Sequence, residues 1–431
     1  MALIVQKFGG TSVANPERVC SVADRIARSY SEGHRVVVVV SAMGDTTDEL
    51  IDLAYKISKE PPHREMDMLL TTGERISMAL LSMALSDRKI PALSLTGSQT
   101  GIITDSSHRR ARIQRILGDR VRAALDDKKV VIVAGFQGVS ETKEVTTLGR
   151  GGSDTTAVAL AVALKADFCD IYTDVDGVYS ADPRIVPQAK LLKSISHDLM
   201  VELATRGAGV LHPRSVELAK QFGVILRVKN SLNENEGTTV VSNEFKNEGG
   251  VQRGGQNKIP MSMAGGMPRG MPRGMPRGME DFRVTGITSD LSKILITVSL
   301  ARPTVLGALW DRAGESHLSV VAPQFSKGEV SFFSDRDGQD EWKKNLEQLV
   351  TQGFVNEYRL DTDTVPLSVV GDRFSQDGTA LCQVIEILAA ENIQVTIGNA
   401  SALSMTVGVP FSQVEDGIRV LHSKFLASGV L

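Results

Sequence analysis

The amino-acid sequence predicts an α/β protein, in which a mainly parallel sheet lies between two layers of helices and is followed by two small ferredoxin-like βαββαβ units. Three observations support this fold class. Over residues 1–243, short Val- and Ile-rich runs alternate with helical stretches, which is the pattern of a sheet with helices on both faces. A segment rich in Met, Pro, Arg and Gly then interrupts the chain at residues 244–281. After it, one βαββαβ pattern is followed by a second, degenerate copy.

The predicted strands of the first part are apolar along their whole length, as expected of strands covered on both faces. A helix is expected at residues 16–30, because Asn15 is a favourable N-cap and Pro16 suits the first helical position. Ligands of such sheets bind outside the carboxyl ends of the strands. The predicted strands are residues 3–6, 35–40, 130–134, 169–173 and 224–228.

Residues 244–281 repeat Met-Pro-Arg-Gly three times in succession and contain little that could be buried, so they predict a linker. The chain is therefore expected to form a domain at 1–243, this linker, and two units at 282–361 and 362–431. The first unit has predicted strands at 294–300, 317–322, 329–334 and 354–360, with helices at 304–313 and 339–352. The second has predicted strands at 365–370, 393–397 and 403–409, with helices at 378–391 and 411–426.

The composition excludes several classes of protein. Of the 431 residues, 42% are apolar and 23% charged, which is typical of a globular chain with more than one core. A net charge of −3 provides no basic field for nucleic acid. The longest strongly apolar run, residues 36–40, is far too short for a membrane span, and no signal peptide is visible. Three widely separated cysteines indicate neither a disulfide framework nor a zinc site, so we expect a cytoplasmic protein.

The first motif follows the first predicted strand and reads Lys7-Phe8-Gly9-Gly10-Thr11-Ser12. Glycines let a backbone approach an anion closely, and the following helix N-terminus favours negative charge. Lys7 can supply a point charge for a phosphate. The motif is not a Walker A loop, because the lysine precedes the glycines, and its structural alternative is a strand–helix turn that needs small residues.

Two further motifs are weaker when taken alone. Residues 41–48, which include Ser41 and Thr47, place hydroxyl and backbone N–H groups directly after the second strand, but an ordinary capped loop has the same composition. Glu74 lies at the start of a predicted helix, where an acidic residue is favourable for helix stability without any function.

The most specific motif is residues 147–156, a glycine-rich loop at a helix start that contains Arg150, Ser153 and Asp154. A guanidinium suits a carboxylate ligand, and an aspartate here can orient a lysine or a metal-bound phosphate. A loop with a purely structural role has little need for this combination. Residues 172–184 follow another strand and can contact a nucleotide; their candidate side chains are Thr173, Asp174, Tyr179 and Arg184.

These five motifs, in this order, resemble those of the aspartate kinases of the amino-acid kinase family. The matching residues are 7–13, 41–47, 73–74, 149–154 and 173–179, and the two C-terminal units resemble paired regulatory ACT domains. The resemblance implies the three-layer fold of that family and the reaction of ATP with L-aspartate to give ADP and 4-phospho-L-aspartate. This reaction begins the biosynthesis of lysine, threonine, methionine and diaminopimelate.

The resemblance also implies roles for individual residues. Lys7 would stabilise the transferring phosphoryl group, Gly9 and Gly10 would cradle the phosphates, and Asp154 would orient Lys7. Mg²⁺ would bind mainly through the ATP phosphates, with no protein ligand assigned. Arg150 would bind the α-carboxylate of aspartate, Glu74 its ammonium, and Ser41, Thr47 and Ser153 the remainder. Thr173, Asp174, Tyr179 and Arg184 would bind ATP. The substrate's own carboxylate is the nucleophile, so no general base is required.

The sequence departs from the family pattern at three places. Gly209 stands where many relatives have a nucleotide-facing lysine, so either the affinity for ATP is lower or Lys229 or Arg214 replaces that lysine. The first unit has Arg302-Pro303-Thr304 where an effector loop is common, whereas Asp377-Gly378 of the second unit is closer to the usual form. Asp377, Gly378 and Gln324 are the candidate effector-binding residues. The segment 398–401 also differs from the expected effector strand, and the linker is longer than the family requires.

Lysine, threonine or both are the expected effectors, acting through the ACT domains. A homodimer or higher oligomer is expected, and internal starts at Met261, Met263 or Met279 could produce a separate regulatory subunit. Two alternatives remain at this point. One is a kinase for another carboxylate, such as glutamate or N-acetylglutamate. The other is an amino-acid sensor with an inactive kinase site, which the intact Lys7, Glu74, Arg150 and Asp154 disfavour.

Overall fold

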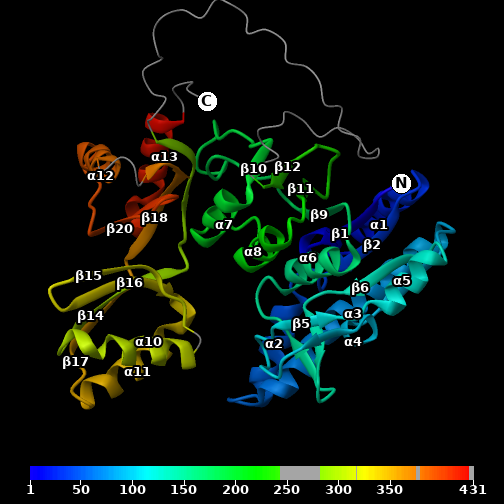
Figure 1. Cartoon of the computed structure of the whole chain (residues 1–431), viewed down its shortest axis with the longest axis horizontal. Helices are drawn as coiled ribbons and strands as arrows, with labels where there is room; N and C mark the ends of the chain where they lie inside the picture. The colour runs from blue at the N-terminus through cyan, green and yellow to red at the C-terminus, as the bar shows by residue number, and fades with distance from the viewer. Residues whose placement is uncertain (243–281, 317, 375–378, 427–431) are drawn as a thin grey trace, which may run out of the picture.

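The computed structural model describes residues 1–242, 282–316, 318–374 and 379–426 (Figure 1). The predicted linker at 244–281 and the effector candidates Asp377 and Gly378 lie outside these residues. In Figure 1 the first part of the chain occupies the right-hand side, and the two small units lie on the left. No helix among the described residues is sufficiently long and apolar to span a membrane.

The first part contains an eight-stranded sheet of order β10-β12-β11-β9-β1-β2-β6-β3. Its neighbouring strands are parallel except for β11 and β12, so the predicted mainly parallel sheet is confirmed. All five predicted strands belong to it, although β11 begins two residues later than predicted. The strands are β1 Leu3–Phe8, β2 Arg35–Val40, β3 Ala92–Leu95, β6 Val130–Ala134, β9 Phe168–Thr173, β10 Ser194–Ser196, β11 Leu226–Asn230 and β12 Thr238–Val241.

Helices cover both faces of this sheet, which explains the uninterrupted apolar strands. Along β2, Val36 and Val38 contact one layer, whereas Val37 and Val39 contact the other. The first layer contains α1 (Pro16–Ser31) and α3 (His63–Asp87), and α2 (Thr46–Ile57) packs on α3. Opposite it lie α5 (Asp119–Asp126), α6 (Gly152–Leu164), α7 (His197–Thr205) and α8 (Pro213–Phe222). Asn15 caps α1 as predicted, because its Oδ1 accepts a hydrogen bond from the Arg18 amide at 2.9 Å.

A second, smaller sheet in this domain was not predicted from the sequence, because its strands are only three or four residues long. It has the order β5-β4-β7-β8, and its last strand leads directly to Arg150. The short helix α4 (Gly97–Thr100) precedes it. The strands are β4 Ile102–Thr104, β5 Ile113–Ile116, β7 Gln137–Ser140 and β8 Val145–Thr147.

The first small unit has the predicted βαββαβ order and a sheet of order β15-β16-β14-β17. Trp342, Phe332 and Leu346 fill its core beneath the helices. Its second strand begins later than the predicted 317–322, because the β15–β16 pairing is irregular around Ala322, which has a positive φ of 51°. The elements are β14 Lys293–Leu300, η2 Pro303–Val305, α10 Leu306–Glu315, β15 Val321–Ser326, β16 Glu329–Asp335, η3 Arg336–Gly338, α11 Gln339–Thr351 and β17 Val355–Asp361.

The second unit takes one strand from outside its predicted range. Its sheet has the order β13-β18-β20-β19, and β13 (Arg283–Ser289) pairs antiparallel with β18. The predicted boundaries assigned these residues to the first unit at 282–361, so that assignment was wrong for this strand. The second pattern lacked a fourth strand of its own, and β13 fills the position beside β18. The other elements are β18 Thr364–Asp372, α12 Ala380–Ala390, β19 Ile397–Ala400, β20 Ser404–Pro410, η5 Phe411–Gln413 and α13 Val414–Phe425.

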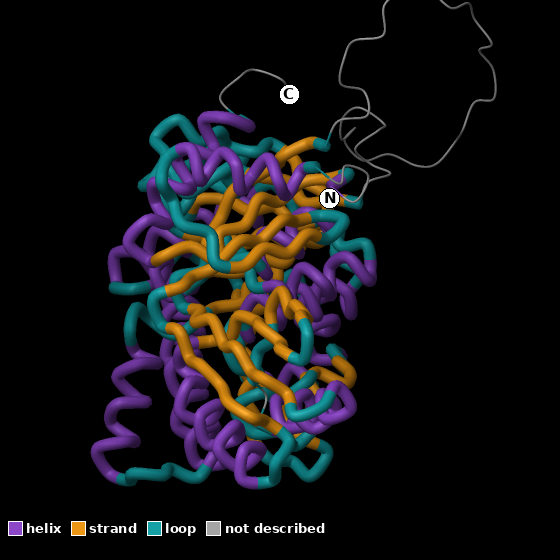
Figure 2. The backbone as a smooth tube through the Cα atoms, turned by 90° about the vertical axis from the view of Figure 1, so that its left-hand side faces the viewer, coloured by secondary structure: helices purple, strands orange, loops and turns teal. Residues whose placement is uncertain are grey.

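The two units attach differently to the first domain. Ala181 and Val186 of that domain lie in the apolar core of the second unit, and Ser180 Oγ is 3.0 Å from His422 Nε2 of α13. The first unit approaches the domain through an exposed ion pair, in which Arg150 and Asp337 are 3.7 Å apart. Figure 2, which faces the two units, shows their sheets one above the other.

Candidate active site

The parallel strands β1, β2 and β9 end side by side, and their carboxyl ends bring the first two sequence motifs together. The Ser41 amide donates to the Phe8 carbonyl at 3.1 Å, and the Gly9 amide donates to the Tyr172 carbonyl at 3.4 Å. The phosphate-binding candidates therefore lie between the Ser41 loop and the start of the Thr173 segment, as expected for a ligand site in an α/β sheet.

Lys7 and Asp154, 147 positions apart in sequence, form an ion pair of 2.7 Å. Their side chains are 13% and 12% exposed. Lys7 extends from β1 on the same face as Val5, towards α6, and Asp154 lies in the first turn of α6. A carboxylate in the first turn of a helix is stabilised by the helix dipole. The pair thus fixes an ammonium group at the end of β1, beside the glycine loop.

The glycine loop leaves little room for a side chain at Gly10. A Cβ atom on Gly10 would lie 3.0 Å from the Ala42 carbonyl oxygen and 3.2 Å from that of Gly44. A Cβ atom on Gly9 would lie 3.4 Å from Lys7 Nζ. The Gly44 amide donates to the Gly10 carbonyl at 3.2 Å, so this loop and the Ser41 loop form one packed surface. Gly10 is required for that close approach, whereas a Cβ atom at Gly9 would make only ordinary van der Waals contact.

Glu74 lies on α3 and is only 3% exposed. Its Oε1 accepts a hydrogen bond from the Ala42 amide at 3.2 Å, whereas Oε2 has no hydrogen-bond partner in the part of the chain that the structure describes. Burial raises the pKa of Glu74 to about 7. A buried carboxylate with a free oxygen is well suited to a cationic ligand, because such a ligand would replace the lost hydration.

Arg150, in contrast, is 87% exposed and points towards Asp337 of the first unit. The loop that carries it depends on Gly149 and Gly151, which have positive φ angles of 77° and 68°. A Cβ atom on Gly151 would overlap the His212 ring. Arg150 is thus presented to solvent by a tightly packed loop. Ser153 is buried on α6, and Ser41 and Thr47 are half-buried.

The proposed nucleotide residues follow β9. The Thr173 hydroxyl donates to Asp174 Oδ1 at 3.1 Å, and Tyr179 forms an isolated bridge with Leu191. Arg184 is 88% exposed and is bound to Asp182 at 2.6 Å. The turn between Thr173 and Tyr179 is held by Asp176, whose carboxylate accepts hydrogen bonds from the side chains of Asn230, Asn233 and Asn235.

Neither proposed substitute for the missing lysine at Gly209 is available. The Arg214 guanidinium donates to the carbonyls of Leu148 and Ala111, at 3.0 and 3.1 Å. Lys229 is 3.3 Å from Asp170, which is 2% exposed and also binds Arg227 at 2.5 Å. Both side chains therefore have structural partners in this conformation, which favours the other alternative, a lower affinity for ATP.

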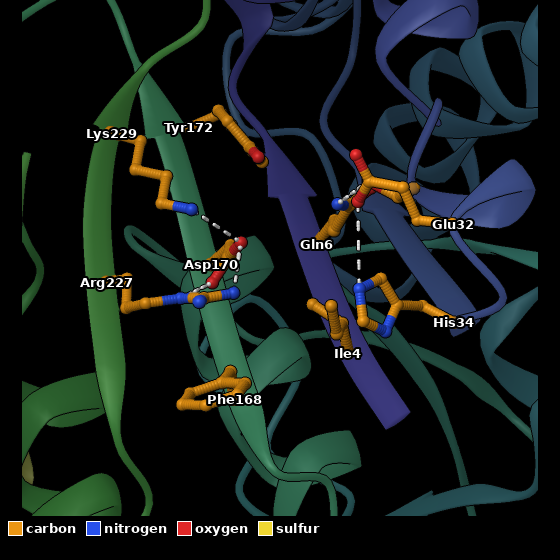
Figure 3. A pocket seen from close by; sticks show the side chains of 10 residues that line it. Ile4, Gln6, Glu32, His34, Phe168, Asp170, Tyr172, Arg227 and Lys229 are labelled. Carbon is orange, nitrogen blue, oxygen red and sulfur yellow. Dashed lines mark hydrogen bonds and ion pairs between the residues drawn. The ribbon is translucent and has the colours of Figure 1, made fainter. Parts of the chain in front are cut away.

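Lys229 instead lines a hollow of about 200 Å³ formed by residues of β1, β9 and β11 together with Ser29 of α1, Glu32 and His34. Figure 3 shows Lys229 and Arg227 directed at Asp170 on one side, with Gln6, Glu32 and His34 opposite. This hollow contains none of the residues predicted for the active site apart from Lys229. Of the predicted residues, Lys7, Gly9, Gly10, Ser41 and Thr173 lie at the ends of β1, β2 and β9, outside this hollow.

Gln324, on β15, lies where the two small units meet. Its side-chain amide donates to the Gly398 carbonyl of β19, and the Asn399 side chain donates to the Pro323 carbonyl at 3.3 Å. Gln324 also lines a hollow of about 210 Å³ together with Thr297, Ser331 and Ile397. The unusual segment 398–401 therefore forms the contact edge of the second unit.

The sequence reasoning missed one buried group beside the site. Asp67 of α3 is fully buried and accepts hydrogen bonds from the Thr147 hydroxyl and the Arg109 amide, and it contacts His108. A signal was present, because Asp67 occupies an inward position among Met66, Leu70 and Thr71 on a helix. A carboxylate at such a buried position requires hydrogen-bond partners from other parts of the fold.

Comparisons with known proteins agree with this architecture. The model of the Amino acid kinase family matches residues 2–230, which is more than half of the chain. An aspartokinase of Bacillus sp. (strain MGA3) is 42% identical over 433 residues, covering 100% of this chain and 98% of that protein. The chain therefore belongs to the amino acid kinase family and, within it, to the aspartokinases, and it is a kinase.

Solved structures share the fold over nearly the whole chain. Aspartokinase III of E. coli in complex with aspartate and ADP (R-state) superimposes with a TM-score of 0.79 at 23% identity, covering 98% of this chain and 99% of that one. The same enzyme in complex with lysine and aspartate (T-state) gives a TM-score of 0.69 at 24% identity, with 98% and 99% covered. The predicted α/β domain followed by two ferredoxin-like ACT units is thus confirmed.

Proposed function

We propose that this kinase transfers the γ-phosphoryl group of ATP to the side-chain carboxylate of L-aspartate, giving ADP and 4-phospho-L-aspartate. This reaction would begin lysine, threonine, methionine and diaminopimelate biosynthesis, in the cytoplasm where ATP and aspartate occur. One observation carries the proposal: the Lys7–Asp154 ion pair lies beside the glycine loop in the same domain as a buried carboxyl group, Glu74, and an exposed cation, Arg150. The names of the full-length relatives and the ligands of the E. coli enzyme support it.

The phosphoryl group would be stabilised by Lys7, while the amides of Gly9 and Gly10 would contact the phosphates. Asp154 would hold the Lys7 ammonium in place. Phosphoryl transfer depends on position and charge more than on covalent chemistry, and the aspartate side chain is already ionised at neutral pH. These residues would therefore be sufficient without a general base.

The amino acid would bind between two charges of opposite sign. The free oxygen of Glu74 would accept the substrate ammonium, and the Arg150 guanidinium would bind the α-carboxylate through paired hydrogen bonds. Ser41, Thr47 and Ser153 would contact the rest of the substrate. Such an arrangement would direct the side-chain carboxylate of aspartate towards Lys7.

The nucleotide would bind over Thr173, Asp174, Tyr179 and Arg184, and Arg184 would exchange its contact with Asp182 for a phosphate. Among the described residues, no group of three His, Cys, Asp or Glu side chains could hold a metal ion. Mg²⁺ would arrive on the phosphates of ATP, where it neutralises their charge.

Feedback regulation would act through the two ACT units. Lysine is bound to one E. coli aspartokinase III structure, and lysine or threonine is the proposed effector here. Gln324 lies at the junction of the two units and would contact the effector, together with Asp377 and Gly378. Pairing of ACT units would give a homodimer or higher oligomer, with a separate regulatory subunit as a further partner.

A coupled ADP-release assay with Mg-ATP tests the proposal. We expect turnover with L-aspartate, little with L-glutamate, and inhibition by lysine, threonine or both. Turnover with glutamate alone would favour a different carboxylate kinase. An absence of turnover with each substrate, from protein that still binds ATP, would contradict the proposed function.

A further inference from the structure

The buried carboxylate of Asp67 has no part in the reaction proposed above, yet it lies on the helix that carries Glu74 and contacts the strand that leads to Arg150. Asp67 has 0% exposure, and a buried carboxylate is costly unless donors surround it. Its partners come from the end of strand β8 and from the loop between β4 and β5, both outside α3.

Three groups contact the Asp67 carboxylate. The Thr147 hydroxyl donates to Oδ1 at 2.6 Å, and the Arg109 amide donates to Oδ1 and Oδ2 at 3.0 and 3.2 Å. His108 Nδ1 is 2.7 Å from Oδ2. Both oxygens are thus engaged, and bonds to a charged acceptor are stronger than those between neutral groups.

These contacts join the two proposed ends of the substrate site. Asp67 and Glu74 are seven residues, or about two turns, apart on the buried face of α3, a distance of about 10 Å along the helix axis. Thr147 is the last residue of β8, three positions before Arg150. The Asp67–Thr147 bond therefore ties the helix of Glu74 to the loop of Arg150.

The hydrogen bond from the Arg109 amide to Asp67 also supports the loop that carries Arg150. Arg109 has a positive φ of 68°, a conformation that costs energy for a residue with a side chain. A Cβ atom on Gly149 would lie 2.9 Å from the Arg109 carbonyl oxygen, so the two backbones are in close contact. Asp67 holds the Arg109 amide and thereby fixes the surface against which Gly149 packs.

We propose that Asp67 is a positioning residue that sets the separation between the Glu74 carboxylate and the Arg150 loop, and through it the preference for aspartate over longer amino acids. This inference rests on the proposed function. Because the two ends of the amino acid would be held by Glu74 and Arg150, their spacing determines where the side-chain carboxylate meets Lys7. A small displacement there lowers the rate strongly.

The test compares Asp67→Asn, Thr147→Val and Thr147→Ser, with Glu65→Gln as a control on an exposed face of the same helix. In the ADP-release assay, Asp67→Asn and Thr147→Val should raise KM for aspartate about tenfold and reduce the aspartate-to-glutamate ratio of kcat/KM by a similar factor. KM for ATP should remain within about twofold. Thr147→Ser, which keeps the hydroxyl, and Glu65→Gln should behave like the wild type.

Two results would overturn the inference. One is an unchanged KM for aspartate in Thr147→Val, which remains informative even if Asp67→Asn fails to fold. The other is an equal rise in KM for ATP and aspartate, since a general loss of structure would cause it. Wild-type protein that turns over no aspartate would instead refute the proposed function, and the inference with it.

Discussion

Glu74 and Arg150, the two groups proposed for the ends of the amino acid, lie in opposite environments. Glu74 is 3% exposed on a helix packed against the central sheet, and its position is determined by the core of the first domain. Arg150 is 87% exposed, and its 3.7 Å partner, Asp337, belongs to the first ACT unit. One half of the proposed site is thus built into the kinase domain, whereas the other half is within reach of the first ACT unit.

The two ACT units also differ in whether their contacts with the first domain are buried or exposed. The second unit shares buried apolar contacts with the first domain and adds the Ser404–Glu202 hydrogen bond of 2.5 Å. The first unit meets the site through the exposed Arg150–Asp337 pair, and exposed pairs contribute little to stability. A displacement of the first unit would therefore alter Arg150 and leave the buried half of the site in place.

The largest effect is expected in the buried half, for Lys7→Ala. Loss of this charge should lower kcat about 10²- to 10³-fold, because Lys7 would stabilise charge in the transition state. The coupled ADP-release assay measures it, with a thermal melt as the control for folding. Unchanged phosphorylation of aspartate would show that Lys7 has no such role.

Glu74→Gln tests whether the buried carboxylate of Glu74 destabilises the folded protein. The pKa of Glu74 is raised from 4.5 to about 7, so the folded state favours the protonated carboxyl group. The charged carboxylate therefore destabilises the folded protein. The penalty is absent below pH 4.5, grows as the pH rises to 7 and is complete above it. At pH 8, Glu74→Gln should be more stable than the wild type by up to about 3 kcal/mol, with almost no difference at pH 4.5.

Denaturant unfolding at the two pH values measures this difference. The same variant should bind aspartate more weakly, and wild-type KM for aspartate should fall as the pH rises from 6 to 8. A stability difference that does not depend on pH would contradict the raised pKa of Glu74.

Arg150→Gln tests the exposed half. We expect KM for aspartate to rise about 10- to 100-fold, as for the loss of a hydrogen-bonded charge pair, with KM for ATP unchanged. Stability should not change, since the side chain is exposed. An unaltered KM for aspartate would remove Arg150 from the substrate site.

Asp337→Asn should have the smallest effect. Removing the partner of Arg150 should lower KM for aspartate by less than about fivefold, and added salt should abolish the difference. Kinetics at low and high ionic strength measure it. A rise in KM would show that Asp337 supports the Arg150 loop and does not compete for its charge.

The sequence predicted those strands and helices that carry a clear local pattern. Strands such as β2 and β6 and the cap at Asn15 were predicted correctly, because apolar runs and helix caps are local signals. The pairing of β13 with the sheet of the second unit was not predicted, because strand pairing depends on which sheet edge remains open. The small sheet before Arg150 was missed since strands of three or four residues carry almost no pattern.

For the site, the motifs indicated which residues are chemically distinctive but not how they pair. The Lys7–Asp154 contact and the separation of buried Glu74 from exposed Arg150 depend on the fold. The structure also shows that Arg214 and Lys229, the proposed substitutes at Gly209, each have a partner that only tertiary structure provides. Asp67 was visible in the sequence only as an acidic residue at an inward helical position.

The most direct test of the account is the ratio of kcat/KM for L-aspartate to that for succinate, which lacks the ammonium group, in wild-type protein and in Glu74→Gln. A site that pairs a buried carboxylate with the ammonium should reject succinate by a factor of about 10³ or more, and this ratio should fall at least tenfold in Glu74→Gln. The same ratio in both proteins would show that Glu74 does not bind the substrate ammonium and would contradict the account.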